Sequence, residues 1–307
     1  MAEALRSAGG TVGEGALLTH VAPPVASPFG TATRVESERV LAVDVGGPAS
    51  PPDAVAFLDG IQRYAVEGRF GLVPVVRGYA AAAVLEREGA DLKVARARRE
   101  EFIVVARSRL GPAQEAALEE VGLPIIECDA AERSHPILDV QFAAKEVERR
   151  REVVETELAA GHLEEKPGTW LVVDGSLGGI GQLEAGERVV GLVKSHETQF
   201  LEGADLEVAL TLPEGHRTSV FARSAGQRGR VFSFYLRLWP WQEHDLLHGL
   251  VRIERPPGEA VADATDVSRW LLAERAPLSA PDGRWDRLIY PIRQVETFLR
   301  AEAGGWW

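Results

Sequence analysis

Cysteine is almost absent from this chain: Cys128 is the only one among 307 residues. A lone thiol can close no disulfide within the chain and can build no cysteine-rich zinc site. Any bound metal must therefore be held by oxygen or by histidine. The seven histidines show no paired spacing of the His-Glu-x-x-His type, and neither Cys128 nor Ser176 has an evident histidine partner for nucleophilic catalysis.

Long apolar runs and an excess of basic residues are lacking too. No segment approaches the roughly 18 uncharged apolar residues that a membrane span needs, and the N-terminus has no basic flank followed by an apolar core. We therefore expect a soluble, cytoplasmic protein. The formal net charge of −12 argues against a protein that coats nucleic acid through bulk electrostatics, but it is compatible with local basic patches.

The order of the predicted elements indicates a mixed α/β fold. Hydrophobic residues make up 45% of the chain, enough for a sizeable core. We interpret the aperiodic residues 1–35 as a flexible leader, 36–303 as one domain and 304–307 as a tail. Short β-branched runs predict strands at 40–45, 70–76, 102–105, 170–173, 188–193, 219–222, 231–238 and 250–253. Periodic apolar positions predict helices at 112–121, 139–160, 263–272 and 292–301.

Two predicted strands end in an aspartate that is followed by small residues. The first reads Val43-Asp44-Val45-Gly46-Gly47, and the second reads Val173-Asp174-Gly175-Ser176. A carboxylate at the end of an apolar strand has a fixed position, and neighbouring glycines allow a phosphate or a metal to approach closely. The simpler interpretation is that each aspartate only begins a turn. If both belong to a metal site, Asp44 and Asp174 should lie side by side on adjacent strands.

The predicted helix over 139–160 is rich in glutamate. At 100° per residue, Glu155 and Glu157 flank the apolar stripe through Val147, Val154 and Leu158, so either side chain could lie along the sheet, whereas Glu152 lies farther round. A solvated helix face is the simpler role for any one of these glutamates.

Several short motifs, in this order, resemble the NurA family of nucleases. They are Val43-Asp44, the Arg/Glu-rich segment 149–158, Leu171-Val172-Val173-Asp174-Gly175-Ser176-Leu177, residues 190–195, residues 234–238 and Tyr290-Pro291. The likeness extends over about residues 39 to 300. It implies an RNase H-like fold with inserted strands, a homodimer, and a role in DNA end processing with a HerA-type hexameric ATPase.

The resemblance also implies a metal site. Acidic ligands on the first strand, on the helix and at the Asp-Gly-Ser strand map to Asp44, Glu155 and Asp174, and the expected activity is manganese-dependent or magnesium-dependent cleavage of DNA. Two divalent ions bridged by carboxylates would activate a water and stabilise the leaving oxygen.

The chain departs from the family pattern after Tyr290-Pro291, where family members carry a metal-binding histidine. Here the sequence reads Ile292-Arg293-Gln294-Val295-Glu296, and no histidine follows His248. We take Glu296 as the substitute ligand, because carboxylates also bind magnesium and manganese. The alternative is that Glu296 only decorates a solvated helix.

Positive charge and aromatic rings are interleaved downstream of the second aspartate. Arginines suit backbone phosphates and aromatic rings suit unstacked bases, so this region is the candidate track for single-stranded DNA. The candidate nucleic-acid contacts are Lys194, Arg223, Arg230, Tyr235 and Arg237. A solvated hairpin with its tryptophan side chains packed into the core is the competing interpretation.

Two other function classes fit parts of the sequence. Asp44-Val45-Gly46-Gly47 and Asp174-Gly175-Ser176-Leu177-Gly178-Gly179 resemble the two phosphate loops of sugar kinases and actin-like ATPases, although no adenosine motif is evident. The missing histidine instead fits a nuclease fold that survives as a non-enzymatic scaffold for a DNA translocase. Metal-dependent cleavage of single-stranded DNA would distinguish a nuclease from both.

Overall fold

The computed structural model describes residues 1–12, 29–89, 91–128, 135–179, 187–196, 198–224, 230–275, 287 and 289–304. The strands are β1 (Thr11–Val12), β2 (Ala32–Arg34), β3 (Ala42–Asp44), β4 (Val55–Phe70), β5 (Val73–Glu88), β6 (Asp91–Val105), β7 (Ile125–Glu127), β8 (Trp170–Asp174), β9 (Val189–Val193), β10 (His216–Thr218), β11 (Phe221–Ser224), β12 (Arg230–Arg237) and β13 (Leu250–Arg255). The helices are α1 (Ala2–Ser7), α2 (Pro112–Glu119), α3 (Pro136–Glu165), α4 (Gly203–Leu210), α5 (Ala264–Ala273) and α6 (Tyr290–Glu302), with single 3-10 turns η1 (Arg107–Arg109) and η2 (Leu177–Gly179).

One large mixed sheet organises this part of the chain, with the strand order β2-β11-β12-β13-β9-β8-β4-β5-β6-β7. At its centre, β4, β5 and β6 are antiparallel neighbours, β8 runs parallel to β4, and β9 runs parallel to β8. Helix α3 connects the first three of these strands to the last two. This is the strand order of an RNase H-like core, so the predicted mixed α/β class is confirmed.

Three long strands form the middle of the sheet, where the sequence pattern predicted short ones. β4 and β5 each span 16 residues and meet at a tight turn over Gly71, whose φ is +59°. The predicted strand over 70–76 is therefore divided: Phe70 ends β4, residues 71 and 72 form the turn, and residues 73–76 begin β5. Leu72 is 63% exposed at this turn, so its apolar side chain gave a misleading signal.

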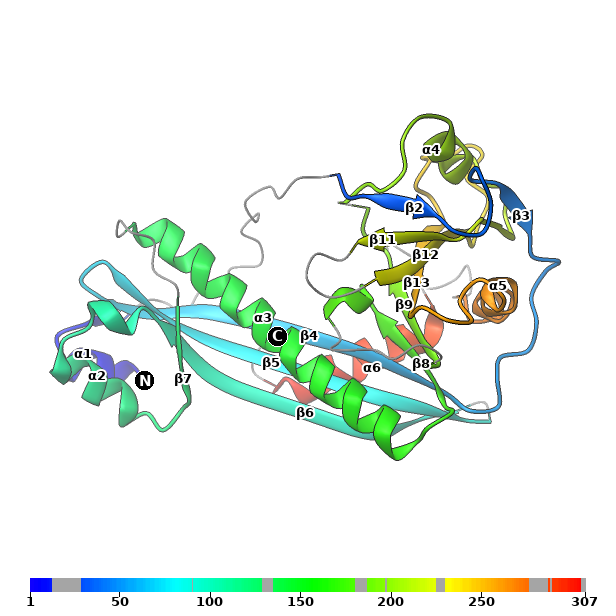
Figure 1. The fold of residues 1–307 in the computed structure, drawn as a ribbon. Helices are drawn as coiled ribbons and strands as arrows, with labels where there is room; N and C mark the ends of the chain where they lie inside the picture. Colours follow the sequence, from blue (N-terminus) through cyan, green and yellow to red (C-terminus); the bar gives the residue numbers. More distant parts are fainter. Residues whose placement is uncertain are drawn as a thin grey trace.

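Helices cover both faces of the long strands (Figure 1). Val154 and Leu158 of α3 pack against Ala56 and Leu58 of β4 on one face. On the other face, α6 packs its buried stripe, including Ile292 and Val295, in the same cluster as Phe57 and Ile61 of β4. Successive residues of β4 thus alternate between the α3 face and the α6 face, as the period of a strand requires.

The interpretation of residues 1–35 as a leader does not describe its two ends. Leu5 of α1 is fully buried beside Phe70 and Leu118, β1 pairs with β4, and β2 pairs with β11. Residues 13–28, between these segments, lie outside the described residues, as do Trp306 and Trp307. Among the helices that the structure describes, none is long and apolar enough to cross a membrane.

Candidate functional site

Two aspartates end the parallel pairing of β4 with β8. The last paired residues are Leu58 and Val173, so the next residues, Asp59 and Asp174, follow at the same level of adjacent strands. Asp174 is the last residue of β8, whereas β4 continues for eleven residues beyond Asp59. By strand alternation, Asp59 shares the face of Phe57 and Ile61, which is the α6 face of the sheet.

Glu155 of α3 approaches the same point from the opposite face. Its side chain lies over Gly60, where a Cβ atom would come within 2.2 Å of Glu155 Oε1. Any residue with a side chain at position 60 would displace the carboxylate. Gly60 therefore allows Glu155 to reach β4 next to Asp59. We refer to Asp59, Glu155 and Asp174 as the carboxylate cluster.

Burial and like charge act strongly on this cluster. Asp59 is 7% exposed, and its burial together with the nearby charge of Asp174 raises its pKa well above the ordinary value. Burial raises the pKa of Glu155 to about 7, although Arg151 opposes the shift. Both shifts show that the metal-free protein holds negative charge in this place at a cost in stability.

Two cations partly offset the three carboxylates. Lys194, one residue past β9, donates from Nζ to Asp174 Oδ2 at 2.7 Å. Arg151, one helical turn before Glu155, donates from Nη1 to Glu155 Oε1 at 2.5 Å and from Nε to the side chain of Gln62. Because three carboxylates face two cations, the ionised cluster has a formal charge of −1.

The chemistry of this donor set suits a divalent cation. Asp174 Oδ1 is buried without a hydrogen-bond partner, and oxygen-only ligands are those that magnesium and manganese prefer. The three carboxylates come from both faces of the sheet, however, and within the described ranges no three His, Cys, Asp or Glu side chains are already placed to ligate one ion. The residues fit a cation in type and charge, and binding would require their side chains to close around it.

Asp44 lies elsewhere in the fold. β3 pairs with β10, whereas β8 pairs with β4 and β9, so the prediction that Asp44 and Asp174 are on adjacent strands is wrong. Asp44 is exposed, and its Oδ1 accepts a hydrogen bond from the Gly46 amide at 2.9 Å. This is the turn that the simpler interpretation of the motif predicted.

The residue that sequence reasoning missed is Asp59, and a signal for it was present. Phe57-Leu58-Asp59-Gly60 repeats the pattern of two apolar residues, aspartate and glycine seen in Val172-Val173-Asp174-Gly175. Asp-Gly is also a common turn signal, and here it lies inside a 16-residue strand rather than at the end of one.

Glu296 is found among cations. It forms an ion pair with Arg300 one turn later in α6, and it raises the pKa of Arg63, whose net shift is downward because burial dominates. The charges that act most strongly on Asp59 are those of Asp174, Lys194 and Glu155, and Glu296 is not among them. The structure thus brings Glu155, Asp174 and Lys194 together, and a ligand role for Glu296 stays a prediction.

The predicted nucleic-acid track is largely interior. Arg223 is 6% exposed, Tyr235 is 3% exposed, and Arg237 is fully buried. Arg237 donates to the carbonyls of residues 210, 212, 246 and 248, so its guanidinium holds loops together. The competing interpretation, a solvated hairpin, does not describe the two arginines either, because both are buried in the interior. The side chain of Arg230 lies outside the described residues.

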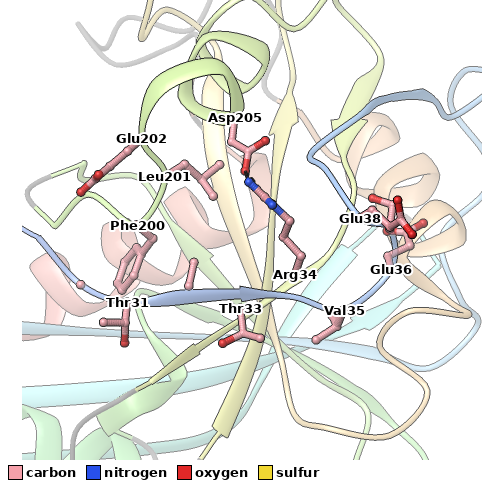
Figure 2. A pocket seen from close by; sticks show the side chains of 13 residues that line it. Thr31, Thr33, Arg34, Val35, Glu36, Glu38, Phe200, Leu201, Glu202 and Asp205 are labelled. Atoms are coloured by element: carbon pink, nitrogen blue, oxygen red, sulfur yellow. Dashed lines mark hydrogen bonds and ion pairs between the residues drawn. The ribbon is translucent and has the colours of Figure 1, made fainter.

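A pocket of about 990 Å³ lies away from the carboxylate cluster, between β2 and the start of α4. Figure 2 shows Thr31 and Thr33 on one side of it and Phe200 and Glu202 on the other, with Arg34 paired to Asp205 across the gap. The pocket contains none of the three carboxylates. The chemistry of the cluster, rather than the size of this pocket, marks the candidate site.

Comparison with known proteins gives only distant likenesses. The NurA nuclease from Sulfolobus solfataricus aligns over 82% of this chain and 80% of that chain, with 11% identity and a TM-score of 0.47. The catalytic domain of human Endonuclease V aligns over 82% of each chain, with 18% identity and a TM-score of 0.32. No protein-family model and no curated protein matches the chain. Likenesses this distant do not establish an activity, so the assignment below depends on the carboxylate cluster itself.

Proposed function

We propose that this chain is a divalent-metal-dependent nuclease whose ligands are Asp59, Glu155 and Asp174. The observation that carries the proposal is the register of β4 and β8, which brings Asp59 and Asp174 to the same level of adjacent parallel strands, with Glu155 reaching them over Gly60. Carboxylates whose pKa values are raised by burial and by a specific charged neighbour are candidates for a functional site.

Each residue of the site has a role in this proposal. Bound Mn²⁺ or Mg²⁺ would supply an activated water and would stabilise the leaving oxygen of a phosphodiester. Asp59 and Asp174 provide oxygen ligands from the sheet, and Glu155 provides one from α3. Arg151 orients Glu155, and Lys194 holds Asp174 and offers positive charge to a phosphate.

The substrate and partners follow from the sequence resemblance. We expect DNA, as single strands or at ends, to be the substrate, a HerA-type hexameric ATPase to be the partner, and the protein to act as a homodimer in the cytoplasm. Cleavage assays with single-stranded DNA, and mass measurement in solution, test the first and last of these expectations.

The hydrogen bonds in the loop after β8 argue against the kinase-like alternative. In a phosphate loop the backbone amides must be available to the phosphate. Here the Leu177 amide donates to Glu254 at 2.9 Å and the Gly178 amide donates to Ser176 Oγ at 3.1 Å. In the other loop, the Gly46 amide is already bonded to Asp44.

The decisive experiment makes the same substitution at three aspartates. Asp59→Asn removes a proposed ligand, and Asp44→Asn makes the same change at an exposed turn of β3. We expect Asp59→Asn and Asp174→Asn to reduce manganese-dependent cleavage of single-stranded DNA at least about 100-fold, and Asp44→Asn to leave it unchanged.

Two other outcomes would change the assignment. If Asp44→Asn abolishes cleavage while Asp59→Asn does not, the site has been placed wrongly. If the unmutated protein cleaves no DNA with either metal, the nuclease proposal is refuted and the scaffold alternative takes its place.

A further inference from the structure

One buried carboxylate fastens the turn that follows Asp174 to the sheet. Glu254 of β13 is fully buried, and its Oε2 accepts three hydrogen bonds. The donors are Ser176 Oγ at 3.0 Å, the Leu177 amide at 2.9 Å and Arg223 Nη2 at 2.6 Å. A single oxygen thus restrains both the side chain and the backbone of the turn.

Two arginines complete this arrangement. Arg223 Nη2 also donates to Ser176 Oγ at 2.6 Å, and Arg252 Nη2 lies 3.2 Å from the second oxygen of Glu254. Both guanidinium groups lie over the ring of Phe200, at 5.5 Å and 4.5 Å from its centre. Glu254 is therefore held by arginines on two sides, and its hydrogen bonds to Ser176 and Leu177 tie the turn to the sheet.

The turn itself has little freedom. Gly175 has a φ of +116°, a conformation that glycine adopts without strain, and its amide donates to the Leu192 carbonyl at 2.9 Å. A Cβ atom at Gly191 would lie 2.8 Å from the Gly175 carbonyl oxygen, so β9 passes close beneath the turn. Leu177 is buried at 2% exposure and fixes the far end.

The direction of the Asp174 carboxylate depends on this backbone. Lys194 holds Oδ2, but Oδ1 is buried and has no hydrogen-bond partner that would orient it. We propose that Glu254, acting through Ser176 and Arg223, is a positioning residue that aims Asp174 Oδ1 at the divalent cation. This inference rests on the proposed function.

A purely structural role for Glu254 makes a different prediction, and the same strand offers the control. Arg255 of β13 forms a second ion pair, in which its Nη2 donates to Asp263 Oδ2 at 2.6 Å. Arg255 is 3% exposed, so removing the charge of Asp263 also leaves a buried arginine without its carboxylate. Among the contacts of the described residues, none joins Asp263 to the turn that follows Asp174.

The test measures metal binding without DNA. Full-length protein, Glu254→Gln and Asp263→Asn are melted at pH 8 over a range of manganese concentrations, and the concentration that gives half of the full rise in Tm is recorded. Loss of a residue that orients a metal ligand typically weakens metal affinity by about 10-fold to 100-fold. We expect Glu254→Gln to raise the half-saturating manganese concentration by a factor of that size and Asp263→Asn to leave it unchanged. Both substitutions should lower the Tm in the absence of metal.

Ser176→Ala gives a second, milder variant that keeps all the buried charges, in case Glu254→Gln fails to fold. We expect it to raise the half-saturating manganese concentration in the same direction by a smaller factor. If Glu254→Gln and Ser176→Ala both bind manganese as Asp263→Asn does, the positioning role is refuted while the proposed function stands. If neither manganese nor magnesium raises the Tm of the unmutated protein, the proposed function fails and this inference fails with it.

Discussion

Replacing Glu155 by glutamine should stabilise the metal-free protein, and the gain should depend on pH in a way that isolates the carboxylate cluster. In the folded protein burial raises the pKa of Glu155 from 4.5 to about 7. As the pH rises from 4.5 to 7, the unfolded chain loses this proton while the folded chain keeps it. The contribution of Glu155 to the free energy of unfolding therefore falls between pH 4.5 and pH 7 and is constant above pH 7.

The size of the effect follows from the two pKa values. At pH 8 the raised pKa costs about 3 kcal/mol, and at pH 5 it costs about 1 kcal/mol. Glutamine has no proton to lose, so Glu155→Gln should gain about 2 to 3 kcal/mol more at pH 8 than at pH 5 relative to the unmutated protein. Arg151 interacts more favourably with the ionised carboxylate than with the protonated one, and this difference is already contained in the pKa of about 7.

Urea denaturation in the presence of a chelator, at pH 5 and at pH 8, measures this difference. Glu157→Gln is the matched control: it lies on the same helix, is 47% exposed, and forms an ion pair with Arg98. We expect its effect to be nearly the same at both pH values. Equal effects of Glu155→Gln at pH 5 and pH 8 would show that Glu155 is not held in a strained, ionised state, and would remove the main electrostatic argument for a cation site.

Three further changes test other parts of the site and fold. Lys194→Gln removes a charge that lowers the pKa of Asp59, so the acid limb of the cleavage profile should move to higher pH; a limb that stays in place would contradict this coupling. Gly60→Ala inserts a Cβ atom 2.2 Å from Glu155 Oε1, and manganese titrations should show weaker binding; unchanged binding would mean that Glu155 is not a ligand. Arg237→Lys should destabilise the fold by about 2 kcal/mol or more in thermal denaturation, because carbonyls of two loops lose buried donors; a loss of DNA binding at unchanged stability would restore Arg237 to the nucleic-acid track.

The sequence could point to Glu155, Asp174 and Lys194 because the signals for these residues are local. The apolar run that ends at Asp174 is a strand because both of its faces are buried, and the stripe through Val154 and Leu158 orients α3 so that Glu155 faces the sheet. In both places the side chains that decide the structure are within a few residues of the functional one. The same holds for Lys194, which directly follows a buried strand.

Asp59 could not be found in this way because the long strands do not alternate as a surface sheet does. Helices cover both faces of β4, so both faces of this strand carry apolar residues near Asp59. The alternation of apolar and polar residues that marks a half-exposed strand is therefore missing. The motif at Asp44 carried a clearer strand-and-turn pattern, yet β3 has only three residues and is mostly exposed. Which of two similar motifs enters the centre of the sheet is decided by long-range pairing, and the local pattern does not contain that information.

The buried arginines show a second limit of local patterns. Arg237 reads as a charge beside aromatic residues, but its partners are carbonyls from segments up to 27 residues away in the sequence. Arg223 also belongs to this pattern of charge beside aromatic residues, and its partners lie 31 and 47 residues away in the sequence. A guanidinium whose donors are satisfied as those of Arg237 are can be buried at moderate cost, so interleaved charge and aromatic rings do not by themselves indicate a surface.

The unequal lengths of β4 and β8 explain why the carboxylate cluster forms where it does. β8 ends at Asp174, so its pairing with β4 stops beside Asp59, while β4 continues to Phe70 and next pairs on this side with β1, at Gly68 and Arg69. The interior of a long strand is rigid, and the end of its neighbour leaves room for side chains to approach. Asp59 thus has the fixed position and the burial of a core residue, and it lies beside the end of a neighbouring strand. That combination accounts for a carboxylate that burial destabilises and that a cation, bound where the neighbouring strand ends, would stabilise.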